Sequence, residues 1–192
     1  MRIFLSVLIL IFSLQSWSKA DDISDFEIEG MSIGDSLLDH YSINKIEKYF
    51  KSRGSSTSYT DDSFLYVSIP LKKKNFEKIG VHHKKNDKEY IIYGLSGIIF
   101  FDNFQECLNK QIEIESSISS LLNNFNKKKY NIDKNQTNGE RKITSIEFSN
   151  KNNDTIGIDC TDWSEKMKFT DNLRLDFLTK ELNIWLNTKA YE

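Results

Sequence analysis

The stretch DNFQECLNKQIEIESSISSLLNNF, residues 102–125, decides the fold. Asp102 and Asn103 are followed three residues later by Gln105 and Glu106, respectively, a spacing that caps the start of a helix. One set of side chains then recurs at spacings of three and four residues: Phe104, Cys107, Leu108, Gln111, Ile114, Ile118, Leu121, Leu122 and Phe125. The stretch therefore predicts a long helix over about 103–125 with one face packed on a sheet.

The segments around this helix predict strands, because they are short, rich in β-branched and aromatic residues, and bounded by turn-forming residues. The predicted strands are 64–71, 76–84, 89–101, 143–148, 155–160 and 173–177. Pro70 favours an edge position for the first strand, and Gly94 and Gly97 indicate a bulge or a close backbone approach in the third. Residues 126–142 are almost all polar and predict a long solvated connection.

The two ends of the chain predict shorter elements around this sheet. Residues 25–29 alternate apolar and acidic side chains as a half-buried strand does, and residues 32–50 predict two short helices or one bent at 40–42. Thr179 caps a closing helix. The expected fold class is α+β: a mostly antiparallel sheet of about five to six strands, with one long helix (about 103–125) and a C-terminal helix packed on it. We expect a single domain over residues 21–192.

The first twenty residues predict an export signal. Arg2 precedes an apolar run over residues 3–14, and the segment ends in Ser18-Lys19-Ala20, which predicts cleavage between Ala20 and Asp21. The run is shorter than the roughly 20 residues that a membrane-spanning helix needs, although an uncleaved tether remains the alternative. No later segment is apolar enough to cross a membrane. We therefore expect a periplasmic or secreted protein.

The charge balance argues against a nucleic-acid partner. The chain holds 28 acidic and 26 basic residues, a formal net charge of −2, and its lysines are interleaved with acids. A nucleic-acid binder would gather a net basic face instead. The abundant Lys and Asn are explained by AT-rich codons. The partner that composition leaves open is a protein or a small ligand.

The only two cysteines predict a disulfide. Cys107 belongs to the apolar face of the main helix, and Cys160 is in phase with Ile156 and Ile158 on the inward face of its strand. Both therefore point at the same core, and exported chains with an even number of cysteines usually pair them. The alternative is a pair of buried free thiols. Because no Cys-x-x-Cys is present, thiol oxidoreductase activity is not expected.

No catalytic constellation is visible, so no catalytic residue is predicted. The segment Gly94-Leu95-Ser96-Gly97 lacks the Gly-x-Ser-x-Gly spacing of a nucleophile turn, and we interpret it as part of a strand. Ser42 and Lys45 match Ser-x-x-Lys, but no companion motif accompanies them, and a helix cap explains Ser42 better. A hydrolase with an unrecognised acid or serine site, near Ser42 or Asp39, remains the alternative.

No metal or other cofactor is predicted either. His82 and His83 would point to opposite faces of a strand, and we interpret them as a solvent-exposed hairpin tip. The acids near Cys160 match no calcium loop and are interpreted as a solvated turn: Asp159, Asp162, Glu165 and Asp171. A ligand site between strands could be lined by Tyr66, Tyr90, Tyr93, Phe100 and Phe101, although such residues are usually core.

The segment FEIEGMSIGDSLLD, residues 26–39, together with residues 90–101 and Cys107, resembles small exported uncharacterised proteins of AT-rich marine alphaproteobacteria. Its Ile-x-Gly-Met-Ser start followed by a helix is also similar to the small outer-membrane assembly lipoproteins of the BamE type. The resemblance implies an envelope address and brings no activity with it. We expect a non-enzymatic exported binding or interaction domain.

Overall fold

The computed structural model describes residue 20 and residues 22–50, 59–72, 74–136 and 139–192. The predicted signal segment 1–19 and Asp21 lie outside the described residues. Ala20, the last residue before the predicted cleavage site, is buried. Cleavage at this point stays a prediction.

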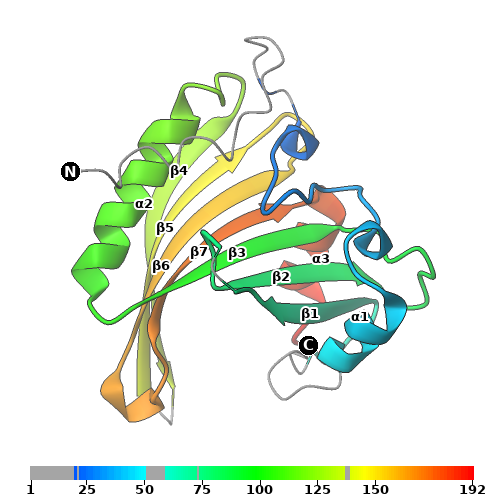
Figure 1. Ribbon diagram of the computed structural model, residues 1–192. Helices are drawn as coiled ribbons and strands as arrows, with labels where there is room; N and C mark the ends of the chain where they lie inside the picture. Colours follow the sequence, from blue (N-terminus) through cyan, green and yellow to red (C-terminus); the bar gives the residue numbers. More distant parts are fainter. Residues whose placement is uncertain (1–19, 21, 51–58, 73, 137–138) are drawn as a thin grey trace.

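Seven strands form one antiparallel sheet in the order β1-β2-β3-β7-β6-β5-β4 (Figure 1). The strands are β1 Phe64–Pro70, β2 Lys78–Lys84, β3 Gly94–Phe101, β4 Asn126–Gln136, β5 Gly139–Ser149, β6 Thr155–Trp163 and β7 Asp171–Leu178. β1 is an edge strand that ends at Pro70, as predicted. The α+β class and the antiparallel sheet are confirmed, with more strands than the five to six expected.

The helices are α1 Ile43–Phe50, α2 Phe104–Ser119 and α3 Lys180–Thr188, with 3-10 turns at Ile23–Asp25, Leu37–Asp39 and Glu165–Met167. Asn103 Oδ1 accepts a hydrogen bond from the Gln105 amide at the start of α2. α2 ends at Ser119 rather than at the predicted Phe125, although Leu122 is still buried. The apolar spacing therefore continued beyond the helix into two turns that pack on the same core.

The expectation of a solvated connection over residues 126–142 was wrong. β4 and β5 pair without a break from Asn126↔Ser149 to Gln136↔Gly139. β4 lies at the edge of the sheet, and the described side chains along it are mostly exposed. The strand consequently lacks the apolar alternation by which sequence patterns reveal strands.

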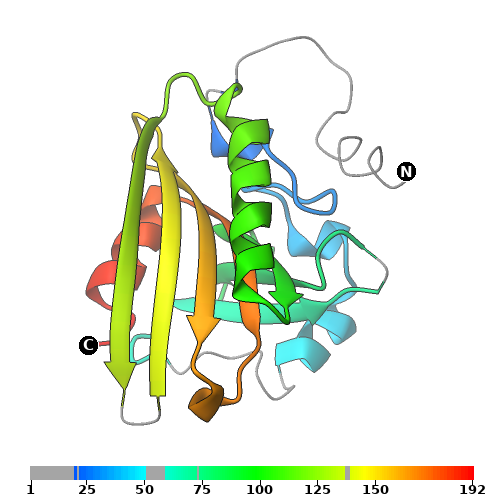
Figure 2. The ribbon, with the colours of Figure 1, turned by 90° about the vertical axis from the view of Figure 1, so that its left-hand side faces the viewer.

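The two faces of the sheet are covered by different helices. Val81, Leu95 and Phe177 are opposite one another in the register, and the strand residues that point the same way form the α2 face. The alternate residues, which include His82 and Ser96, form the α3 face. Figures 1 and 2 show α2 on one side of the sheet and α3 on the other. The larger apolar core lies on the α2 face, and a smaller cluster around Trp185 lies under α3.

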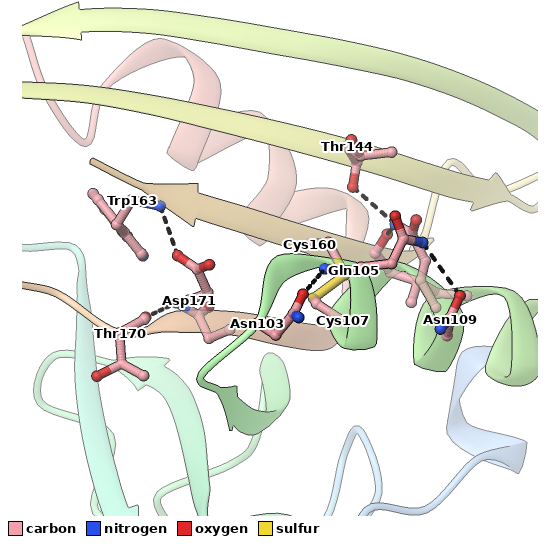
Figure 3. The surroundings of a disulfide bond; sticks show 12 residues. Asn103, Gln105, Cys107, Asn109, Thr144, Cys160, Trp163, Thr170 and Asp171 are labelled. Atoms are coloured by element: carbon pink, nitrogen blue, oxygen red, sulfur yellow. Dashed lines mark hydrogen bonds between the residues drawn. A yellow bond between two sulfur atoms is a disulfide. The ribbon is translucent and has the colours of Figure 1, made fainter. Parts of the chain in front are cut away.

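The predicted disulfide is present. It joins Cys107 of α2 to Cys160 of β6, with the two Cα atoms 5.9 Å apart, and both residues are fully buried (Figure 3). Gln111, one helical turn further along α2, donates hydrogen bonds from Nε2 to the carbonyl oxygens of Thr144 and Ile158. α2 is thus held to the middle of the sheet by a covalent bond and by side-chain hydrogen bonds to strand carbonyls.

Residues 22–50 add to the core without forming the predicted strand at 25–29. At the end of that predicted strand, Ile28 and Met31 form an isolated bridge, and both side chains are buried. The two short helical segments that follow, at Leu37–Asp39 and Ile43–Phe50, match the first of the two alternatives for residues 32–50. No helix in the described part of the chain is long and apolar enough to span a membrane.

The predicted close approaches at two glycines of β3 are confirmed. A Cβ at Gly97 would lie 2.5 Å from the ring of Phe76, and a Cβ at Gly94 would overlap Leu182 of α3. The strand remains in continuous register through both positions, as its pairing with β7 shows. These glycines therefore make room for side chains that cover the two faces of the sheet.

Candidate functional site

The interpretation of His82 and His83 as an exposed hairpin tip was wrong. β2 continues to Lys84, so both histidines lie inside the strand, with exposed fractions of 1% and 3%. They do point to opposite faces, as expected. His82 Nε2 lies 2.8 Å from the hydroxyl of Tyr59. Burial, together with Arg174 and His83, lowers the pKa of His82 to about 3, so this imidazole is neutral at neutral pH.

The candidate pair Ser42 and Lys45 is arranged as the start of a helix. The Ser42 carbonyl accepts hydrogen bonds from the amides of Lys45 and Ile46, and Ser42 itself is exposed. The ammonium of Lys45 lies over the ring of Tyr41, 4.6 Å from its centroid. This contact directs the Lys45 amine to the aromatic ring, so the geometry gives no support to a serine–lysine dyad.

The acids near Cys160 do not form one solvated turn. Glu165 is exposed in the β6–β7 connection, whereas Asp171 accepts a hydrogen bond from the Trp163 amide at 2.9 Å. Asp159 lies inside β6, on the α3 face, which corrects the expectation for this residue. Within the described ranges, no group of three or more His, Cys, Asp or Glu side chains is placed to hold a metal ion.

The five aromatic residues considered as a ligand site are divided between the two faces. Tyr90 and Phe101 pack against the core of the α2 face, and Tyr93 packs against the cluster under α3. Tyr66 lies over Gly80 on the α3 face, with its ring centroid 4.8 Å from that of His82. The structure therefore gives these residues no common pocket.

A polar network on the α3 face joins the buried residues Ser96 and Asp176 to Arg174, whose side chain is 36% exposed. Sequence reasoning did not find it. Ser96 donates a hydrogen bond to Asp176 Oδ1 and accepts one from Arg174 Nη2 at 3.1 Å. Arg174 Nε donates to the same Asp176 oxygen at 2.8 Å. Burial opposes the charge on Arg174, but Asp176 outweighs this effect and raises the pKa of the guanidinium. The three side chains satisfy one another.

A second part of this network surrounds Asp159. The sheet register places Asp159 between Arg174 of β7 and Ser145 of β5. Ser145 Oγ donates a hydrogen bond to Asp159 Oδ1 at 2.5 Å. Burial, and then the negative charge of Asp176, raises the pKa of Asp159 to about 6. Arg174 thus lies beside two carboxyl groups and is bound by that of Asp176.

A cleft of about 300 Å³ lies on the α2 face beside β4 and β5. Its acidic residue is Glu115 of α2, whose side chain is only 10% exposed and forms ion pairs with Lys127 and Lys129. Burial favours the neutral carboxyl, but the two lysines outweigh it and lower the pKa of Glu115. The Glu115 carboxylate is therefore already paired with lysines of β4, the strand that borders the cleft.

An apolar pocket of about 150 Å³ lies on the same face, at the other side of α2. Five separate parts of the chain line it: residues 26–29, the β1–β2 connection, β3, α2 and β7. Its lining residues are Phe26, Glu27, Glu29, Asn75, Phe76, Ile99, Lys110, Ile114, Ile118, Leu175 and Phe177. Apolar side chains form most of the wall, and the charged ones are confined to three positions.

The charged group held most deeply in this wall is Glu29. Its side chain is only 3% exposed. Oε1 accepts a hydrogen bond from the Asn75 amide at 3.1 Å, and Lys74 Nζ lies 3.2 Å from Oε2. The pKa of Tyr41 is raised by burial first, and further by the charges of Tyr49 and Glu29. The carboxyl group of Glu29 is therefore buried beside the pocket.

Sequence patterns identified the apolar residues of this pocket as core, but not as the wall of a cavity. Ile114 and Ile118 belong to the predicted helix face, and Leu175 and Phe177 to the predicted strand. The one sequence feature that marks Glu29 is its position directly before Gly30, at a predicted turn. A comparison with protein-family models, curated proteins and solved structures found no match to this chain.

Proposed function

We propose that the protein is an exported, non-enzymatic binding domain, periplasmic or secreted, that takes a small apolar group into the pocket between α2 and residues 26–29. The observation that carries this proposal is the pocket itself, whose wall is mostly apolar and is assembled from five parts of the chain. Ligand sites in proteins typically combine an apolar lining with a few polar groups that fix orientation.

The size of the pocket limits what it can hold. Its volume of about 150 Å³ is below that of most sites for drug-sized ligands. Engineered apolar cavities of about 150 Å³ take up benzene, so a single aromatic ring or a branched aliphatic group of similar size fits. Burying such a group would remove apolar surface from water on both sides, which provides the free energy of binding.

Export is supported by the disulfide and by the N-terminal sequence. A buried Cys107–Cys160 bond is typical of proteins that fold in oxidising compartments. The apolar run over residues 3–14 and the small residues before Asp21 supply the corresponding signal. Mass spectrometry of the protein from the producing cell should find a chain that begins at Asp21, whereas a chain retaining residues 1–20 would contradict cleavage.

Binding can be tested with benzene, toluene and indole as probes, using the melting temperature and two-dimensional NMR. A ligand at ten times its dissociation constant adds about 1.4 kcal/mol to the free energy of unfolding, enough to raise the melting temperature by a few degrees. Ile114→Trp should fill the pocket and abolish the shift. The matched control is Ile112→Trp, because Ile112 lies on α2 but is 59% exposed and does not line this pocket.

Two results would contradict this proposal. No toluene-dependent shift in the NMR signals of Ile114, Ile118 and Phe177 would remove the pocket as a binding site. A shift of the same size in Ile114→Trp and in the control would place the binding elsewhere on the molecule.

A second candidate function, a hydrolase, is favoured by Asp159 alone. A carboxyl group with its pKa raised to about 6, as for Asp159, can donate and accept protons near neutral pH. A screen of ester, glycoside and peptide substrates between pH 5 and 7 tests this function. Activity that disappears in Asp159→Asn would support it, and activity unchanged by that substitution would exclude Asp159.

A further inference from the structure

We propose that the pocket selects a primary amine with one small apolar substituent, and that Glu29 holds the ammonium group at the pocket wall. The inference rests on the proposed binding function and adds the chemical class of the ligand. It is carried by the position, the burial and the incomplete hydrogen bonding of the Glu29 carboxylate.

Glu29 lies at the tip of a tight turn, and yet its carboxylate is buried. Ile28 and Met31 exchange two backbone hydrogen bonds, of 2.9 and 3.1 Å, so that Glu29 and Gly30 form a two-residue loop. Both loop residues have positive φ, 55° for Glu29 and 80° for Gly30, a conformation that favours Gly, Asn and Asp. A glutamate is unfavourable there, and turn tips normally face water. The turn instead directs an acidic side chain into the pocket wall.

The hydrogen bonds of this carboxylate are incomplete. Oε1 accepts from the Asn75 amide, but Oε2 is buried and accepts no hydrogen bond from the described residues. The ammonium of Lys74 lies 3.2 Å from Oε2, close enough for an ion pair, on a side chain that is 53% exposed. A buried acceptor that lacks a well-directed donor lowers stability, so a donor delivered by a ligand would be favoured.

The charges around the pocket favour a cation. Lys74 is paired with Glu29, and Lys110 is paired with Glu113, with 2.9 Å between nitrogen and oxygen. Glu27, the third charged residue of the wall, is exposed, and among the described residues no cation lies within ion-pair distance of it. Among the described residues that line the pocket, acidic side chains therefore outnumber basic ones. A carboxylate ligand would be repelled.

The same features define the rest of the ligand. The apolar wall of Ile114, Ile118 and Phe177 accepts a ring or a branched chain, but the volume of about 150 Å³ excludes a long acyl chain. The amine must carry N–H groups, because Oε2 needs a donor and a quaternary ammonium has none. Benzylamine and 3-methylbutylamine satisfy all of these conditions.

The test compares benzylamine, toluene and phenylacetate at pH 7 by titration calorimetry and NMR, using protein purified after export. We expect benzylamine to bind at least tenfold more tightly than toluene, and phenylacetate to bind more weakly than either. Glu29→Gln should weaken benzylamine binding about tenfold and leave toluene binding unchanged. The matched control is Glu27→Gln, on the exposed rim, with an effect below threefold.

A second variant keeps the proposal falsifiable if Glu29→Gln folds poorly. Lys74→Gln removes the ammonium that competes for Oε2, and it should tighten benzylamine binding without changing toluene binding. Equal affinities for benzylamine and toluene would overturn the amine inference and leave the apolar pocket as a binding site. Failure of both ligands to bind would overturn the proposed binding function itself.

Discussion

The two faces of the sheet are made from the same strands but are stabilised differently. On the α2 face, consecutive strands present Val81, Leu95, Phe177 and Ile156, all buried and all apolar. On the α3 face, the neighbouring residues of β3 and β7 are Ser96 and Asp176, which depend on Arg174. One face is stabilised mainly by the area that it removes from water, and the other also by directed hydrogen bonds between side chains.

This difference determines what each face can tolerate. An apolar core accepts substitutions of similar volume at a small loss of stability, because its interactions have no direction. A buried network loses much more when one member is removed, because the remaining partners are left without hydrogen bonds. The measurements that follow compare the two faces, from the largest expected effect to the smallest.

The largest effect is expected on the α2 face, from the disulfide. Replacing both Cys107 and Cys160 with alanine should lower the free energy of unfolding by about 4 kcal/mol, because the bond closes a loop of more than 50 residues in the unfolded chain. Urea unfolding measures the loss. Dithiothreitol should destabilise the wild type by a similar amount and leave the variant unchanged. A loss below 1 kcal/mol would show that packing alone holds α2.

The next effect is expected on the α3 face, from Arg174. Arg174→Met leaves the carboxylate of Asp176, only 10% exposed, without its cation and should cost about 3 kcal/mol. Adding Asp176→Asn removes the unpaired charge while keeping an acceptor for Ser96, so the double variant should recover more than half of that loss. Additive costs in this double-mutant cycle would mean that the two residues act independently.

The pH dependence of stability should come in part from Asp159, also on the α3 face. Its folded pKa of about 6 lies above the unfolded value, so the folded state binds this proton more tightly. The group therefore causes no loss of stability below about pH 4, and stability falls as pH rises from about 4 to 6, by about 3 kcal/mol. Asp159→Asn should abolish this fall. Parallel stability curves for wild type and variant over that interval would refute the assignment.

The smallest effect is expected at the start of α3. Thr179 Oγ1 accepts a hydrogen bond from the Leu182 amide, and Thr179→Ala should cost about 1 kcal/mol. Amide hydrogen exchange should show faster exchange in α3, with α2 unaffected. An equal change in both helices would mean that the two faces unfold as one unit.

How much of the fold the sequence predicts depends on the face. The helix and strand residues of the α2 face were predicted because apolar side chains recur at helical and strand periods, as Cys107, Ile118 and Leu175 do. The polar residues of the α3 face gave no such signal, since polar positions that alternate with apolar ones predict exposure. Asp159 and His82 were therefore interpreted as solvated, and both are withdrawn from solvent on the covered side of the sheet.

The candidate site was harder to predict for a related reason. A cavity depends on the distance between helices, strands and turns, and the spacing of apolar residues in a sequence does not predict that distance. Glu29 lines the cavity because of its turn conformation. β4 was missed because an edge strand rich in Lys and Asn lacks apolar alternation; Lys127 and Lys129 instead reach Glu115 of α2. Residue patterns thus predict which face is apolar, and not which gaps remain between the elements that cover it.

The place of β7 in the sheet also determines when folding can finish. β7 is the last strand of the chain, but it lies between β3 and β6. Until residues 171–178 have been added, β1–β3 and β4–β6 share no hydrogen-bonded neighbour. A chain synthesised from its N-terminus therefore cannot complete the sheet until it is nearly finished. Folding of the whole sheet would therefore end only when the C-terminal segment arrives.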